Sequence, residues 1–594
     1  MKILKSGLKG LSYYAFISII TIVLLIFVQK LWLCDLRVPM LYTGDVMGAS
    51  VDIKNFILGG GIYNYPRLAM PYGLFSFDVF KGNMIYTIIL RFMSLFTNQF
   101  GLILNVFYLA TYPIIAMSCS FVLRKLKVNY IISLVCGILY SFCPYHFMRN
   151  EGHLYLSSYF LVPFICLILI WVMQDQLLNQ KDINKESKSI SKGILIFTNR
   201  KMLFAIVICC LIASSDIYYS AFTCFCLVFA GLYIFIETKR IRHAFLVLIL
   251  ISFIGLFIFI NDIPTILYYM HNNIMKVVFA RNYQEIEIYG LKISQLLLPI
   301  SGHRIKYLAD LRELYNNNFP LINENNTATL GFIMSIGFIY SIFTVIFKKT
   351  RKIDFTIEKL GKINLFILLL ATVGGISSIV ALIATTSIRC YNRFSIFIAM
   401  FSIMTIALLL QEAFNRFKKS KQQLFLYIIV IVLLIAGVFD QTTNSYILPY
   451  ATTKKEFISD DLFVKAIEKT VDNNDMIFEF PILSKAIGAP VNKLGVYELY
   501  RPYLHSTKTR WSYGDSPGGN SDIWQQSLTT LPLGGIIDNI TKTGFKGLYI
   551  DSFAYTSEDF TKLIKSIQLE LNQVPLKSEN SRLYYFDLSN NKAK

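Results

Sequence analysis

Long apolar runs separated by short polar segments make up the first three quarters of the chain. They recur from residue 12 to residue 442, and a helix of about 20 apolar residues crosses the hydrocarbon core of a bilayer. The first run, 12–34, is longer than the apolar core of a signal peptide and has no small-residue cleavage site, so we expect it to be retained. The pattern predicts a polytopic α-helical membrane protein with about eleven transmembrane helices.

Basic residues in the connections predict how these helices are oriented. We expect helices at 12–34, 101–123, 128–147, 155–174, on both sides of the turn 214–220, and at 243–261, 328–347, 363–386, 394–412 and 423–442. Lys and Arg gather in the connections 124–127, 239–242, 348–352 and 416–421. Because such clusters mark the cytoplasmic side, the N-terminus is expected inside and the loops 35–100 and 262–327 outside. The short apolar segment 84–98, which contains Arg91, is expected to lie at the outer interface.

The composition changes near residue 445 to that of a water-soluble domain. Buried strands are predicted at 476–482, 544–553 and 582–588, and helices at 455–472 and 557–573. This alternation predicts a small α/β domain. We therefore divide the chain into a transmembrane domain, 1–444, and an extra-cytoplasmic α/β domain, 445–594.

Charge and cysteine content exclude several classes of protein. The net charge is +20, but it is spread over the connections between apolar runs, so we expect membrane lipids and not nucleic acid as its partner. Most of the ten cysteines lie within apolar runs and none has metal-ligand spacing. No Walker loop, dinucleotide fingerprint or Ser-His-Asp spacing is present.

The first outer loop carries the leading catalytic candidate. Asp45 lies in the segment TGDVMG, where a carboxylate close to the membrane could remove the proton of an acceptor hydroxyl. The alternative is a turn aspartate that satisfies local amides. Asp52 and Asp78, in the same loop, are expected to be structural.

Three further residues could assist this carboxylate. Glu151 and His153 follow the third predicted helix; they could act as acid, base or phosphate ligand, or form a solvated turn. Asp216 lies between two apolar segments, where a carboxylate is costly unless it is paired. It is a functional candidate unless its turn is solvated.

Four cationic candidates lie in outer segments. His303 and Arg304 follow an apolar stretch that contains Pro299, and Arg389 and Arg393 lie in SIRCYNR. Cations here could hold the phosphate of a lipid-phosphate donor, since arginine binds phosphate through two parallel hydrogen bonds. Anchoring to lipid headgroups is the alternative.

Together these segments resemble the GT-C superfamily of polytopic glycosyltransferases, in particular bacterial members with an extra-cytoplasmic C-terminal domain. The resemblance rests on TGD (43–45), PYG (71–73), LLLPISGHR (296–304), INENNTATLGF (322–332), IRCYNRFSIF (388–397) and YELYRPYLHSTKTRWSYGDSPG (497–518). It implies a polyprenyl-phosphate-linked sugar donor, a lipid-linked or polymeric glycan acceptor, and Asp45 as the catalytic or metal-associated residue. A divalent metal is possible by this resemblance, but a paired-acid motif in the second outer loop is missing.

The leading interpretation is a membrane glycosyltransferase at the outer face of a bacterial cytoplasmic membrane, acting on a cell-wall or surface glycan. The alternative is a transporter or flippase of lipid-linked saccharides, although such proteins usually carry repeated halves, which this chain lacks. A third possibility is an assembly protein whose C-terminal domain binds a partner.

Overall fold

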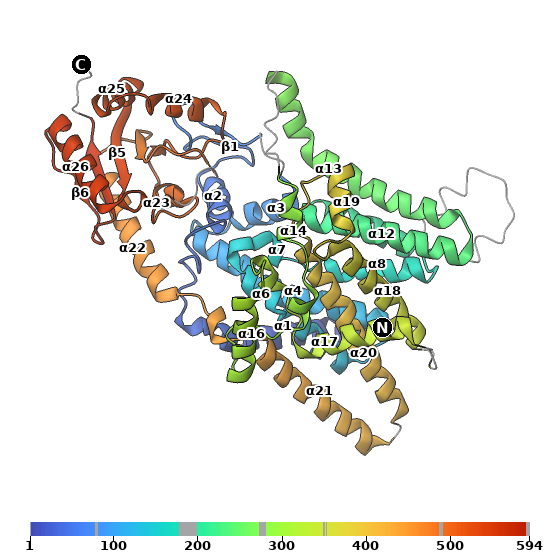
Figure 1. The fold of residues 1–594 in the computed structure, drawn as a ribbon. Coiled ribbons are helices and arrows are strands. Elements are labelled where there is room, and N and C mark those ends of the chain that lie inside the picture. Colours follow the sequence, from blue (N-terminus) through green and yellow to red (C-terminus); the bar gives the residue numbers. More distant parts are fainter. Residues whose placement is uncertain are drawn as a thin grey trace.

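The computed structural model is a helical bundle with a small β-sheet region at one end (Figure 1). It describes residues 2–77, 81–177, 199–272, 281–347, 351, 353–417, 419–485 and 491–589. Asp78 lies outside the described residues.

The helices of the bundle and its connections end at residue 441. They are α1 (Lys2–Gln29), α2 (Val46–Ile57), α3 (Met84–Met93), α4 (Phe100–Lys125), α5 (Tyr130–Ser141), α6 (Pro144–Arg149), α7 (Leu154–Ser157), α8 (Val162–Met173), α11 (Arg200–Ala213), α12 (Ile217–Thr238), α13 (Arg242–Asn272), α14 (Gln284–Ile288), α15 (Ile293–Leu297), α16 (Lys306–Asn318), α17 (Phe332–Ile346), α18 (Asp354–Ala371), α19 (Ile376–Ile383), α20 (Ser395–Arg416) and α21 (Ser420–Gln441). A two-stranded hairpin, β1 (Asn64–Tyr65) and β2 (Leu74–Phe75), follows α2.

The protein is a polytopic helical membrane protein, as predicted. Eight segments of the described chain are long and apolar enough to cross a membrane, and the shorter helices α11, α17 and α18 occupy the other positions at which a helix was expected. The short apolar helix α3 lies where the interfacial segment was predicted.

Several helix boundaries differ from the prediction. The helices expected at 128–147 and 155–174 are each divided, the first into α5 and α6 and the second into α7 and α8. The helix expected at 363–386 is two helices, α18 and α19, because the chain turns between them at Gly374, whose φ is 73°. The helix expected to end at 261 continues to Asn272 as α13, because apolar side chains at Ile263, Ile266 and Leu267 extend its helical pattern. The start of the loop expected at 262–327 is therefore helical.

Glycine allows the central helices to approach closely. A side chain at Gly137 of α5 would lie 2.6 Å from the carbonyl oxygen of Ala116 in α4, and one at Gly361 of α18 would lie 2.0 Å from that of Ser341 in α17. Small residues at such crossings are typical of membrane helix packing, where backbones meet without intervening side chains.

The C-terminal region forms a five-stranded sheet in the order β4-β3-β5-β7-β6. Its elements are α22 (Tyr450–Ile467), β3 (Met476–Phe480), α23 (Arg501–His505), β4 (Arg510–Trp511), α24 (Asn520–Leu528), α25 (Leu533–Thr543), β5 (Phe545–Asp551), α26 (Ser557–Leu571), β6 (Leu576–Lys577) and β7 (Leu583–Asp587). β3 is parallel to β4 and β5, and β7 is antiparallel to β5 and β6. The three predicted strands and both predicted helices are present, whereas β4 and β6 were not foreseen.

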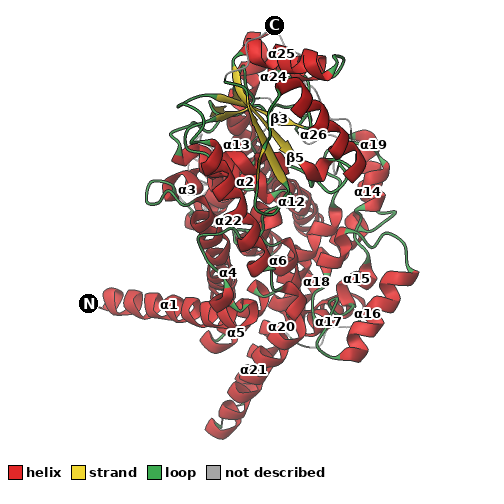
Figure 2. Ribbon diagram, turned by 90° about the vertical axis from the view of Figure 1, so that its left-hand side faces the viewer, coloured by secondary structure: helices red, strands yellow, loops and turns green. Residues whose placement is uncertain are grey.

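The first loop of the membrane region completes the edge of this sheet. The N–H of Trp511 in β4 donates to the carbonyl of Arg67 (2.9 Å), and the N–H of Met70 donates to the carbonyl of Trp511 (3.1 Å). Met70 also packs in the apolar core under the sheet. Figure 2 shows the strands gathered at one end of the molecule, with α2 between them and the bundle and α21 extending from the opposite end. This contact fixes the first loop between the two regions.

Candidate functional site

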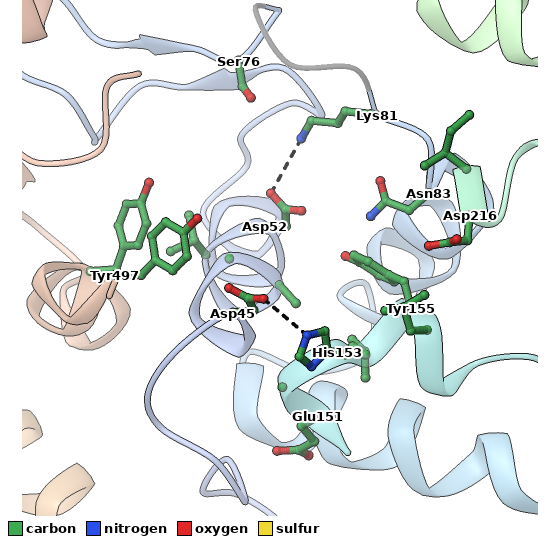
Figure 3. A pocket seen from close by; sticks show the side chains of 18 of the residues that line it. Asp45, Asp52, Ser76, Lys81, Asn83, Glu151, His153, Tyr155, Asp216 and Tyr497 are labelled. Carbon is green, nitrogen blue, oxygen red and sulfur yellow. Dashed lines mark ion pairs between the residues drawn. The ribbon is translucent and has the colours of Figure 1, made fainter. Parts of the chain in front are cut away.

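A cavity of about 500 Å³ lies where the first loop, the bundle and the C-terminal region meet (Figure 3). The polar and aromatic residues that line it include Asp45, Asp52, Tyr65, Ser76, Lys81, Asn83, Glu151, His153, Tyr155, Asp216, Tyr218, Arg393, Lys485, Tyr497 and Tyr500. Five of the eight residues predicted to form a site are therefore gathered in one cavity, although they are far apart in the sequence.

Asp45 directly precedes α2 but does not cap it. Its carboxylate makes no hydrogen bond to the amides of the helix end, and 62 % of its side-chain surface is exposed. Nearby Gly44, with φ of 73°, provides the turn that brings the chain into the helix. The structure therefore does not support the interpretation of Asp45 as an aspartate that satisfies local amides.

The surroundings of Asp45 raise its pKa. Burial by the cavity walls is the main cause, the carboxylate of Glu324 adds to it, and the guanidinium of Arg393 opposes it. The exposed surface of the side chain limits the size of this effect. A carboxylate with a raised pKa is a better proton acceptor in its ionised form.

Glu151 and His153 lie below Asp45 in Figure 3 but differ in their surroundings. Oδ2 of Asp45 is 3.9 Å from Nε2 of His153, which is half-buried. Glu151 is fully buried, and its Oε2 accepts the N–H of Leu41 (3.1 Å). Glu151 thus holds the segment that precedes Asp45, while His153 contacts the carboxylate of Asp45.

Asp216 is the N-cap of α12. Its Oδ1 accepts the N–H groups of Tyr218 (2.8 Å) and Tyr219 (3.2 Å), which satisfies two donors at the helix end. Burial raises its pKa, and Arg393 and these amides oppose the rise. The carboxylate is thus paired with the helix end and also forms one wall of the cavity.

Two buried arginines share one carboxylate beside the cavity. Nη2 of Arg149 is 2.9 Å and Nη2 of Arg393 is 3.4 Å from Oε2 of Glu324, and Arg393 also lies over the ring of Tyr218 at 4.3 Å. The Nε atoms of both arginines have no hydrogen-bond partner among the described residues. Although burial opposes it, the two arginines lower the pKa of Glu324 to about 2. The charge of Arg393 also acts on Asp45 and Asp216, whose pKa values it lowers, and its Nε could donate to an anion in the cavity.

The other predicted cations do not line the cavity. Arg389 forms an ion pair with Glu285 and lies over the ring of Tyr289. Arg304 donates to the carbonyl of Phe439 (3.0 Å) and to the hydroxyl of Thr442 (2.9 Å). Nε2 of His303 lies 3.4 Å from Oδ1 of Asp440. Arg389 is thus paired beside α14, and Arg304 and His303 interact with residues at the end of α21. We therefore do not assign these three side chains to the same site as Arg393.

Several residues in or beside the cavity were expected to be structural or could not be identified from the sequence. Asp52, seven positions after Asp45 and therefore on the same face of α2, forms a second ion pair with Lys81 at 3.7 Å. The spacing of these two aspartates was visible in the sequence. No local sequence pattern identifies Glu324, Lys81 or Tyr497 as site residues, because they come near Asp45 only when the chain folds.

The described residues do not fit a divalent metal ion. Among them no group of three or more His, Cys, Asp and Glu side chains gathers in a way that could hold one. The carboxylates of Asp45 and Asp52 already face His153 and Lys81. We therefore derive no step through a metal.

Comparisons with known proteins give little beyond this geometry. No protein family matches the chain, and no curated protein is similar in sequence. Among solved structures, the crystal structure of the apo oligosaccharyltransferase of Archaeoglobus fulgidus is similar, with a TM-score of 0.46 and 12 % identity over 91 % of this chain and 69 % of that chain. At this level of similarity the likeness carries no inference about function.

Proposed function

We propose that the protein is a membrane glycosyltransferase in which Asp45 is the general base. The observation that carries this proposal is the position of Asp45 in the cavity lining, where its side chain makes no capping hydrogen bond to α2 and most of its surface is exposed. Arg393, which lines the same cavity and whose Nε has no hydrogen-bond partner among the described residues, supplies the complementary half of such a site, a place for the donor phosphate.

The reaction follows from these two parts. The carboxylate of Asp45 takes the proton of an acceptor hydroxyl as the oxygen attacks the anomeric carbon of the donor sugar. The bond between that carbon and the phosphate oxygen breaks, and its electron pair leaves with the lipid phosphate, whose charge Arg393 stabilises. Attack from the face opposite the leaving group inverts the anomeric configuration.

The finer assignments extend this proposal. The donor is a sugar on polyprenyl phosphate, and the acceptor is a cell-wall or surface glycan or a lipid-linked saccharide. The reaction takes place at the outer face of a bacterial cytoplasmic membrane, and residues 445–594 form an extra-cytoplasmic domain. These assignments rest on the resemblance of the sequence segments to the GT-C superfamily and on the positive-inside pattern.

The experiment is transfer from radiolabelled polyprenyl-phosphate sugars by the purified protein in detergent or vesicles. Asp45→Asn retains the size of the side chain and removes its basicity, so the rate should fall by about 10²–10⁴. Asp35→Asn is the matched control, because Asp35 lies in the same loop but pairs with Lys454 outside the cavity.

Near wild-type transfer by Asp45→Asn would exclude Asp45 as the base. Movement of the intact lipid-linked sugar across vesicles, without transfer or release of the sugar, would favour the transporter alternative.

A further inference from the structure

The cavity has a second polar end, which the transfer step above does not use. There Lys81 and Asp52 form their ion pair, and the side chains are only 10 % and 19 % exposed. The hydroxyl of Tyr65 donates to Asp52 and accepts a hydrogen bond from Lys81 (2.7 Å). In Figure 3 Asp52 and Lys81 lie on the side of Asp45 away from His153 and Glu151.

The two ends of the cavity differ in charge. At the first end the buried guanidinium groups of Arg149 and Arg393 face the carboxylates of Glu324, Asp45 and Asp216, whereas at the second end Asp52 and Lys81 compensate each other. The Nε of Arg393, unpartnered within the described part of the chain, offers a charged donor for an anion at the first end. The second end offers a carboxylate that accepts and an ammonium that donates hydrogen bonds, with no net charge, which suits a neutral ligand with several hydroxyl groups.

Tyrosines of the C-terminal region form one wall of the cavity. Tyr497 is half-buried and held in a left-handed conformation with φ of 65°. Its ring is stacked with that of Tyr500, with centroids 6.3 Å apart and planes 19° apart. Both rings line the cavity, and Figure 3 shows Tyr497 across from Asp45 and Asp52. An accessible tyrosine face is a suitable surface for the C–H groups of a sugar ring.

Helix α2 sets the distance between the two carboxylates. Seven residues correspond to about 10 Å along the axis of an α-helix. One sugar ring with its substituents can bridge this separation, so that a sugar bound at Asp52 presents another hydroxyl to Asp45.

We propose that Asp52, Lys81 and Tyr497 form the acceptor site and bind a neutral pyranose through adjacent hydroxyl groups. Asp52 and Lys81 recognise the hydroxyls and Tyr497 supports the ring. The C-terminal region thereby takes part in acceptor selection. This inference rests on the proposed function, because it assigns the substrate class of the same cavity.

The test uses the full-length protein, a radiolabelled polyprenyl-phosphate sugar and a panel of octyl glycosides of glucose, galactose, mannose and N-acetylglucosamine. Transfer to each glycoside and release of sugar to water are measured separately. Asp52→Asn and Lys81→Met should raise the acceptor KM about 10- to 100-fold, since each removes a charge-assisted hydrogen bond. The ratio of transfer to release should fall accordingly.

Deoxy glycosides make the test specific. For the wild type, removal of the hydroxyl bound by Asp52 should raise KM as much as Asp52→Asn does. In Asp52→Asn the same deoxygenation should have little further effect, because the interaction is already lost. Tyr497→Leu should raise the acceptor KM as well, and it keeps the inference testable if the ion-pair variants do not fold. Asp35→Asn is again the control and should leave KM unchanged.

Several results would overturn the inference. The first is an acceptor KM that matches the control in all three variants. The second is an effect of deoxygenation that adds in full to the effect of Asp52→Asn. The third is a wild-type protein that releases sugar to water but transfers it to no glycoside of the panel. A wild type that neither releases nor transfers sugar would instead overturn the proposed function, and this inference with it.

Discussion

The hydroxyl of Thr43 donates a hydrogen bond of 2.7 Å to Oε1 of Glu498, which lies 455 positions later in the chain. The other oxygen of Glu498 accepts from Arg582 at 2.6 Å. Arg582 is paired in turn with Asp551 of β5, also at 2.6 Å. Thr43 is two residues before Asp45, so a buried charge network of the C-terminal region holds the segment that carries the candidate base.

Loss of this network should destabilise the protein. Glu498→Ala leaves Arg582 and Arg501 without one of their carboxylates in a buried setting, and breaking such a pair costs about 3–5 kcal/mol. Thermal unfolding in detergent measures the effect. Glu558→Ala is the control, because its pair with Lys562 is exposed and should contribute little. Equal melting temperatures for the two variants would show that the network is not a major source of stability.

Arg393 and Arg389 should behave differently when each is changed to lysine. Arg393→Lys should weaken donor use about 10- to 100-fold, because the charge remains but the two-bond geometry toward phosphate is lost. Arg389→Lys should have little effect, since Arg389 pairs with Glu285 and does not line the cavity. The measurement is the KM for the lipid-linked donor. An equal increase of the donor KM in both variants would indicate that Arg389 also binds the donor.

Glu324 should make the stability of the protein dependent on acidic pH. Its pKa is lowered from 4.5 to about 2 by Arg149 and Arg393. A carboxylate with a lowered pKa contributes stability that is present above its ordinary pKa and is lost as the pH falls toward the lowered value. The melting temperature should therefore fall between about pH 4.5 and pH 2, and less steeply in Glu324→Gln. Parallel curves for wild type and variant would contradict this assignment.

The sequence predicted more of the helices than of the site. Helix positions depend on local apolar spacing, so all the expected helices and three of the five C-terminal strands have counterparts. Strands β4 and β6 have only two residues each and carry too little pattern to be recognised. The ion pairs of Glu324 and Asp52 join residues distant in sequence, which no local pattern encodes. Arg389 and Arg393 were equivalent in the sequence, and only the fold turns one toward Glu285 and the other into the cavity.

The C-terminal region should be accessible from outside the cell. Lys562→Cys introduces a thiol at a side chain that is 69 % exposed in α26, and Arg416→Cys introduces one at a side chain that is 62 % exposed at the end of α20. A membrane-impermeant maleimide on intact cells should label the first variant above the wild-type background. It should label the second only after permeabilisation. Labelling of the second variant but not the first on intact cells would show that the orientation of the protein in the membrane is opposite to the one derived from the basic clusters.

The acid limb of the pH–rate profile should shift in opposite directions when Arg393 and Glu324, the two charges that act on the pKa of Asp45, are removed one at a time. Asp45 must be ionised to act as the base, so kcat should fall as the pH drops through its raised pKa. Arg393 lowers this pKa and Glu324 raises it. Arg393→Gln should therefore move the limb to higher pH and Glu324→Gln to lower pH, whatever their effects on the absolute rate. In Asp45→Asn the limb should be absent from the residual activity. If both substitutions move the limb in the same direction, or if it persists in Asp45→Asn, the group that titrates is not Asp45.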